Sequence, residues 1–440
     1  MVAVNLPSLR KQFEDWNKKR ESGDDRIMNK RTWIKEVLGL KRENFTLWGI
    51  CVGHGFTHWF PSTFYLLLPL IKEELGLSYT EMGLLITVRY TIGTVANFPS
   101  GMLADLVGRH HLIMSIALAW VGIPYLFLGI SGSYTILLLC MAIIGAGNNL
   151  WHPAALSTLR DVYPRKMGWA MGWNASAANI GDAIGPFLSG IFLTWFTWRS
   201  ILIGSAIPGL ALGLVIWWMI AVIPGRSEQP SQENVKPEKK EKKGLSIREY
   251  MSGLGRLLTN PSILLLSLIN GVRSLVQNGL STFLPSFFMN LMQLSPWLSG
   301  VYMTVIQIAG IIAAPVSGHI SDRLGRKRVV TAAILSTSIA LFLLAFLDIP
   351  WLFIVFLGAV GFFLYALRPV LFAWTMEITP KELGGSAIGV SFSFQSALSA
   401  LAPVFGGWIA DTWGLIYTFY FLAATLLLSN LLVIFVKASE

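Results

Sequence analysis

Charged side chains are scarce in this chain of 440 residues, of which Asp, Glu, Lys and Arg make up 13% and hydrophobic residues 54%. A soluble protein carries about 25% charged residues, so the composition excludes a set of ordinary soluble domains. Cysteine is scarcer still. Cys51 and Cys140 are the only two and both lie in apolar runs, which excludes a disulfide framework and a cysteine metal cluster. The phosphate-binding loop G-x-x-x-x-G-K-[ST] of ATP-driven pumps is also missing.

What the chain has instead is long apolar runs. A membrane helix needs about 20 mostly apolar residues, and nothing in the charged residues 1–44 resembles a cleavable signal. The sequence therefore predicts an all-α membrane protein with 12 transmembrane helices. We expect them near residues 46–70, 81–103, 111–130, 134–158, 168–194, 200–223, 261–290, 297–320, 329–347, 351–376, 385–410 and 415–436.

The net charge of +10 is placed unevenly along this pattern. Nearly all Lys and Arg fall before the first run, after the last, or in the connections from even to odd runs, whereas the other face receives Lys72 and Arg199. The positive-inside rule then predicts a protein of the cytoplasmic (inner) membrane with both termini on the cytoplasmic side. The positive charge orients the protein beside lipid headgroups, so we expect no nucleic-acid partner.

Two polar segments flank the expected helical halves, 45–223 and 261–440. Residues 224–260 are the long polar break and predict a cytoplasmic linker. Residues 1–44 form a basic cytoplasmic segment. In it, Leu9, Phe13 and Trp16 are spaced as on one face of a helix lying on the membrane surface, although a disordered tail fits equally well.

An internal repeat joins the two halves. GMLADLVGR at 101–109 recurs as GHISDRLGR at 318–326, and GPFLSG at 185–190 corresponds to APVFGG at 402–407. Because each half has six helices, the second half starts on the same side of the membrane as the first, and the two halves have the same orientation. Such a parallel repeat is suited to alternating access.

The repeated G-x-x-x-D-x-x-G-R loop resembles the signature of the major facilitator superfamily, over residues 45–437. This resemblance implies two parallel six-helix halves and a cytoplasmic latch between charged loops and helix ends. The corresponding residues here are Gly101, Asp105, Gly108, Arg109, Asp161, Gly318, Asp322, Gly325, Arg326 and Glu377. Alternatively, Arg109 and Arg326 only orient the chain.

Two further motifs indicate the direction of transport. Gly181-x-x-x-Gly185-Pro186 in the fifth run resembles the glycine-proline motif of the family's antiporters, although Ser189 and Asp182 depart from it. His152-Pro153 in the fourth run is similar to the fosmidomycin-resistance branch of exporters. Both resemblances imply drug export.

Three arginines, Arg89, Arg273 and Arg368, lie inside apolar runs, where each costs about 2.5–3.5 kcal/mol on insertion scales. Asp182 is the one carboxylate at similar depth. The surplus of positive charge predicts an anionic ligand, unless Arg273 forms a structural ion pair with Asp182.

The resemblance implies that the first, fourth, seventh and tenth runs surround a central cavity. We expect the substrate to meet Arg273, Arg368, Arg89, His54, His58, Tyr65, Asn148, Asn149, His152, Gln277, Asn278 and Tyr365. The histidines could instead pack structurally. A metal site on His54 and His58 lacks further ligands, and six histidines are too few for the repeated His boxes of membrane metalloenzymes, so we expect no metal, no cofactor and no enzyme.

The sequence thus predicts a monomeric secondary transporter that exports a small anionic or zwitterionic organic solute or drug by proton antiport. Asp182 is the first candidate for proton coupling, followed by His54, His58 and His152, because histidine titrates near neutral pH. An uptake symporter, an anion exchanger and a transporter-like sensor remain alternatives.

Overall fold

The structure, a computed structural model, describes residues 42–107, 109–163, 166–221, 255, 257–344, 346, 350–380 and 383–436. The predictions for the N-terminal segment 1–44 and the linker 224–260 therefore lie almost wholly outside the described residues. Within the described ranges the elements are helices, and no strand occurs.

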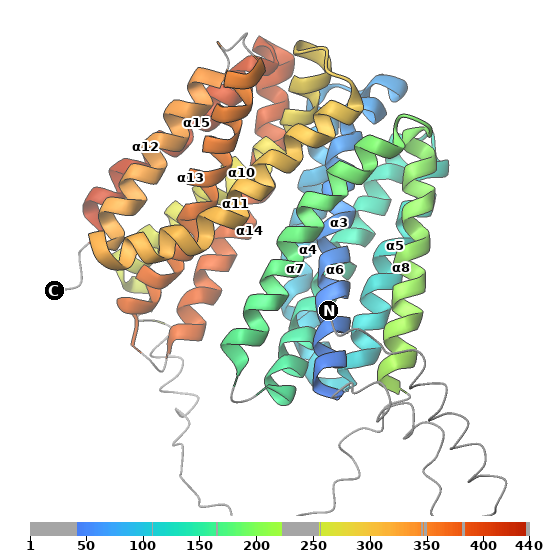
Figure 1. The fold of residues 1–440 in the computed structure, drawn as a ribbon, viewed down its shortest axis with the longest axis horizontal. Coiled ribbons are helices and arrows are strands. Elements are labelled where there is room, and N and C mark those ends of the chain that lie inside the picture. Colours follow the sequence, from blue (N-terminus) through green and yellow to red (C-terminus); the bar gives the residue numbers. More distant parts are fainter. Residues whose placement is uncertain are drawn as a thin grey trace, which may run out of the picture.

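Twelve long helices follow one another in the two halves that the sequence predicts, which confirms the fold class (Figure 1). Nine of the described helices are long and apolar enough to cross a membrane, and α3, α4 and α7 complete the first bundle. The helices are α3 (Arg42–Leu75), α4 (Tyr79–Val107), α5 (His110–Ile130), α6 (Tyr134–Val162), α7 (Met167–Phe192), α8 (Trp198–Ala221), α10 (Pro261–Ser286) with the π-helical turn η2 (Phe287–Leu291), α11 (Pro296–Leu324), α12 (Arg326–Leu344), α13 (Pro350–Glu377), α14 (Gly384–Trp413) and α15 (Leu415–Phe435).

Local signals set several helix ends. The Asn260 side chain accepts hydrogen bonds from the first turn of α10, and Pro261 occupies the first helical position, where its missing N–H costs nothing. Gly325, in the repeated loop, has φ +90° between α11 and α12. This left-handed conformation favours glycine and makes the tight turn that the motif predicts, whereas the matching Gly108 lies outside the described residues.

The same helix pairs pack in both halves. In the first half α3 packs on α7, α4 on α6, and α5 on α6 and α8. In the second half α10 packs on α14, α11 on α13, and α12 on α13 and α15. The internal repeat in the sequence is therefore also a repeat of helix packing.

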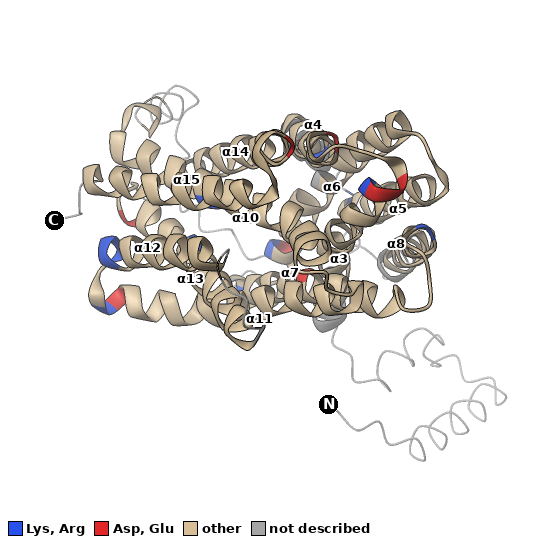
Figure 2. Ribbon diagram, turned by 90° about the horizontal axis from the view of Figure 1, so that it is seen from above, with Lys and Arg blue, Asp and Glu red and all other residues tan. Residues whose placement is uncertain are grey.

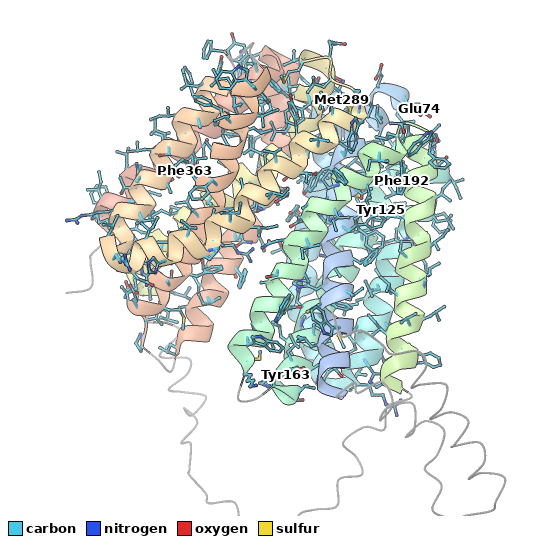
Figure 3. All side chains as sticks on the ribbon, in the orientation of Figure 1. Glu74, Tyr125, Tyr163, Phe192, Met289 and Phe363 are labelled. Carbon is cyan, nitrogen blue, oxygen red and sulfur yellow. The ribbon has the colours of Figure 1, made fainter. Side chains whose placement is uncertain are left out.

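Charge separates the two ends of the bundle. We call the end that carries Arg109, Lys166, Arg326, Lys327 and Arg328 the basic end, and the other the opposite end. Figure 2 shows few charged residues along the helices themselves. Figure 3 places Glu74 and Met289 at the opposite end and Tyr163 at the basic end.

The two halves meet near the opposite end. One apolar core is continuous from Tyr65 and Met82 of the first half to Phe283 and Met303 of the second. Two smaller cores are separate from it, one around Trp151 in the first half and one of Leu257, Ile263, Leu383 and Ala387 in the second. Figure 1 shows the halves converging at the top and diverging below.

Candidate functional site

The first half contributes a chain of titratable side chains on α3, α6 and α7. His58 Nδ1 lies 3.0 Å from Asp182 Oδ2, and Ser62 donates to Asp182 Oδ1 at 2.7 Å. The ring of His54 lies 5.0 Å from that of His58 and 5.3 Å from that of His152, between centroids. Gly181 makes this possible, because any Cβ there would collide with the backbone of α3 at Gly55.

Several polar atoms on or near these helices are buried and have no hydrogen-bond partner among the described residues. They are His54 Nε2, Trp151 Nε1, Asn174 Oδ1 and, one helical turn before His152 on α6, Asn148 Oδ1. The other ring nitrogen of His54, Nδ1, is hydrogen-bonded to the Asn174 carbonyl at 2.8 Å. The structural contacts of His54 therefore satisfy one of its two ring nitrogens and not the other. Buried polar groups without partners are uncommon, and they mark this wall as able to bind a polar ligand. The side chain of Asn149 lies outside the described part of the chain.

The second half contributes Arg273 of α10, which is 1% exposed. Its Nε donates to Asn270 Oδ1 at 3.0 Å and its Nη1 to Gln277 Oε1 at 2.6 Å. No carboxylate among the described residues lies within 4.0 Å of it. The expected alternative of an ion pair with Asp182 is wrong, because Asp182 pairs with His58 instead.

Arg368 of α13 connects the two halves electrostatically. Its charge interacts with Asp182 and Tyr365, with His152 and with Arg273. The residue as a whole is exposed although it lies within a long apolar helix. Tyr365 lies beside Gln277 and Gln307. We call His54, His58, His152, Asp182, Arg273, Gln277, Tyr365 and Arg368 the central polar cluster.

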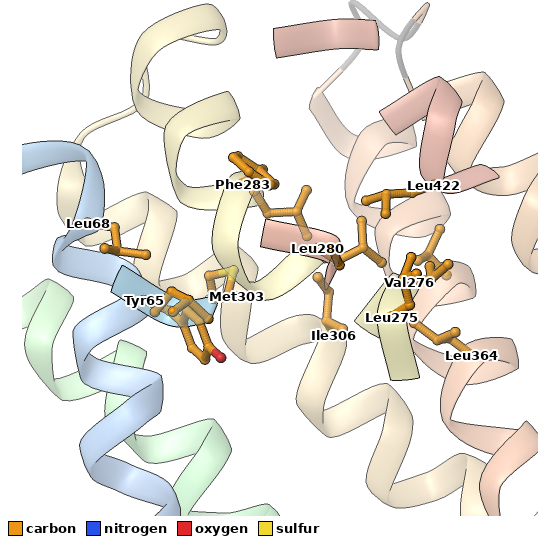
Figure 4. Packing of buried hydrophobic residues seen from close by; sticks show 14 of the residues in the cluster. Tyr65, Leu68, Leu275, Val276, Leu280, Phe283, Met303, Ile306, Leu364 and Leu422 are labelled. Atoms are coloured by element: carbon orange, nitrogen blue, oxygen red, sulfur yellow. The ribbon is translucent and has the colours of Figure 1, made fainter. Parts of the chain in front are cut away.

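Tyr65 and Asn278 lie toward the opposite end and join the halves directly. The Tyr65 hydroxyl donates to Asn278 Oδ1 at 2.7 Å, and Asn278 Nδ2 donates to the Ser399 carbonyl at 2.6 Å. Both side chains are buried. Figure 4 shows Tyr65 beside Met303 within the shared apolar core. This pair therefore closes the space between the halves in the present conformation.

Arg89 stands apart from the central polar cluster. Its charge interacts with three tyrosines, Tyr65, Tyr90 and Tyr125, and its Cζ lies 5.2 Å from the centre of the Tyr90 ring. It lines a separate cavity together with Asn148.

The latch residues behave differently in the two halves. Arg326 forms ion pairs with Asp322 at 2.6 Å and Glu377 at 2.7 Å, so the charged cluster of the second half is assembled. In the first half Arg109 is exposed and Asp161 lies 3.9 Å from Arg160. The side chain of Asp105 is outside the described part, and Gly101 and Gly318 lie within α4 and α11.

Sequence reasoning missed several contacts. Ser62 holds Asp182, Ser391 accepts from Asn270 at 3.0 Å, and Asp411 binds the start of α4. Ser62 could have been found, since it follows His58 by one helical turn. Ser391 and Asp411 are far from their partners in sequence and carried no such signal.

The comparisons with known proteins agree with this fold. The chain matches the Major Facilitator Superfamily over residues 50–323 and 300–440, and it belongs to that family. It is thus a multi-pass membrane transporter for small molecules and not an enzyme.

Among curated relatives, the Multidrug resistance protein MdtG of Proteus mirabilis is 25% identical over 87% of this chain and 93% of its own length. That of Salmonella arizonae is 23% identical over 79% of this chain and 84% of its own. Solved structures with the same fold include a bacterial homolog of the human lysosomal transporter Spinster, in an inward-facing conformation, with TM-score 0.75 and 16% identity over 90% of this chain and 95% of that one. The nucleoside transporter NupG gives 0.71 and 13% over 90% and 99%.

Proposed function

We propose that this transporter exports a small organic solute that carries an acidic group, in exchange for protons. The observation that carries the proposal is Arg273, a buried guanidinium without a carboxylate partner among the described residues. A buried charge is costly unless it is paired, and a ligand's acidic group is a suitable partner. The name of the MdtG relatives, multidrug resistance proteins, supports export.

Arg273 and Arg368 would hold the acidic group, with Gln277 and Tyr365 beside it. Their charges interact, and an anion bound between two arginines relieves their mutual repulsion. The partnerless atoms of His54 and Asn174 would meet the remaining polar parts of the solute.

The charge of the substrate decides the direction of proton coupling. A zwitterion would place its cationic group at Asp182 and compete with a proton there, which gives antiport. A simple anion would instead favour protonation of Asp182 and of the neighbouring histidines, which gives symport. Antiport thus requires a zwitterionic solute, and an uptake symporter for simple anions is the second candidate.

Proteoliposomes with a pH-sensitive dye in the lumen test this. Zwitterionic and simple organic acids are added outside in turn. An entering zwitterion should drive protons out and raise lumenal pH, whereas a co-transported anion should lower it. R273Q should abolish both responses, while R323Q, a change at an exposed arginine of the basic end, should retain them. Responses that survive in R273Q contradict the proposal.

We propose that the protein lies in the cytoplasmic membrane, with its basic end on the cytoplasmic side. The charge of that end supports this. A reporter that is active only in the cytoplasm should then be active when it is fused to either terminus, and a reporter that is active only outside the cytoplasm should be inactive there.

We also propose that the chain works as a monomer, because each half already supplies residues to the central polar cluster. Light scattering of the purified protein tests this.

A further inference from the structure

Arg89 lies in α4 and presents an unusual electrostatic situation. It is 9% exposed, and no carboxylate among the described residues lies within 4.0 Å of it. Its neighbours are tyrosines, and Tyr90 supplies both a side-chain hydrogen bond and a cation–π contact. These neutral partners stabilise the guanidinium by less than a full negative charge would. The site therefore lacks a counter-charge.

A cavity adjoins this guanidinium. It has a volume of about 90 Å³ and is lined by Arg89, Tyr90, Gly93, Thr94, Gly145, Asn148 and Ser396. A single water needs roughly 10–15 Å³, so a small ion fits with some of its water. Among the residues that the structure describes, no acidic one lines the cavity. Because α4 and α6 belong to one half and α14 to the other, the cavity lies in the seam between them, and we call it the seam cavity.

The polar groups of its wall suit an anion. Besides the guanidinium, they include the Ser396 hydroxyl, the Thr94 hydroxyl, which donates to the Tyr90 carbonyl, and the amide of Asn148, whose Oδ1 is buried and has no partner among the described residues. Oxygen and nitrogen of an Asn amide are assigned from their partners, so a half-turn of the amide would direct N–H donors at the ligand. None of Asp182, Arg273 and Arg368 lines the cavity, which separates it from the central polar cluster.

We propose that the seam cavity is a second anion site, which binds a compact monovalent anion such as chloride or a carboxylate at Arg89. The bound ion supplies the missing counter-charge. Because Ser396 belongs to the other half, separation of the halves would dismantle the site. Occupancy therefore favours the conformation in which this seam is closed, in proportion to the difference in affinity between the two states.

The experiment uses the purified full-length chain at constant ionic strength in gluconate, an anion too large for the cavity. Gluconate is replaced stepwise by chloride or, in a second series, by acetate, and thermal unfolding is followed by tryptophan fluorescence. The melting temperature should rise and saturate. In R89Q the rise should disappear or require at least about tenfold more anion, which corresponds to 1.4 kcal/mol, and R323Q should behave as the unaltered chain.

A second variant, S396L, fills the cavity from the other half and leaves Arg89 in place, so it serves even where R89Q does not fold. It should also remove the response. An Arg89-dependent response to chloride identifies a free inorganic ion, whereas a response to acetate alone identifies a carboxylate. A response that R89Q and S396L retain overturns the proposal, and so does the absence of any response. R273Q should retain the response, so the seam cavity and the proposed substrate site can fail separately.

Discussion

Each carboxylate oxygen of Asp182 has its own partner, because His58 Nδ1 lies beside Oδ2 and the Ser62 hydroxyl donates to Oδ1. Asn at this position keeps the shape and the Ser62 hydrogen bond but cannot take up a proton. We therefore expect D182N to lose substrate-driven changes of lumenal pH while substrate–substrate counterflow continues. The control is E74Q, which alters a carboxylate at the opposite end that pairs with Arg199. Coupled proton movement in D182N would exclude Asp182 as the coupling group.

Asn270 acts on the substrate through Arg273. It is fully buried, accepts from Arg273 Nε, and donates to Ser391. Loss of a hydrogen bond to a charged group costs about 1.5–3 kcal/mol. N270A should therefore weaken binding of the transported acid by roughly tenfold to a hundredfold, measured as ligand-dependent thermal stabilisation. N430A, at a half-buried asparagine of α15, is the matched control, and equal losses in both would indicate a general packing defect.

At the scale of the helices, Asp411 of α14 caps α4 across the interface between the halves. Its carboxylate accepts from the backbone N–H groups of Tyr79 and Thr80, both at 2.8 Å, and from the Thr80 hydroxyl at 2.6 Å. The first N–H groups of a helix have no partner within the helix, and the helix dipole favours a negative charge there. This cap therefore fastens the halves at the opposite end.

Removal of a helix cap costs about 0.5–2 kcal/mol. D411A should shift the population toward conformations that are open at the opposite end by a comparable free energy. Met82, which is buried in the shared core, offers a reporter. As M82C, with Cys51 and Cys140 replaced, it should react faster with an impermeant maleimide when D411A is present. T412A, one residue along the same helix, should leave the rate unchanged, and equal rates for D411A and T412A would contradict this role.

The sequence predicts features that depend on neighbouring residues, and it does not predict contacts between residues that are far apart along the chain. Apolar runs gave twelve helices, and the repeat gave their parallel halves, because both depend on local composition and on a fixed spacing. The pairing of His58 with Asp182 depends instead on how α3 and α7 are rotated and packed at Gly55 and Gly181. No periodicity within either helix reports that packing. For the same reason the sequence left an Arg273–Asp182 pair open as an alternative, whereas Asp182 pairs with His58.

For the whole molecule, closure at one end depends on backbones that touch. A Cβ at Gly407 of α14 would collide with the backbone of α4 at Tyr79 and Thr80, whereas a Cβ at Gly389 of the same helix meets nothing within 4 Å. Hydrogen bonds join the halves near this contact, from Tyr79 and Thr80 to Asp411 and from Asn290 to the Tyr79 hydroxyl. The closed end therefore has little tolerance for added volume.

G407V should consequently hold the opposite end apart, while G389V should not. Spin labels at the exposed positions Glu73 and Gln293, one in each half, report the separation by double electron–electron resonance. We expect a longer distance in G407V and an unchanged one in G389V. Transport should fall in G407V, because alternating access requires each end to close in turn. An unchanged distance in G407V would mean that α4 and α14 can shift to accept the side chain, and that closure does not depend on this backbone contact.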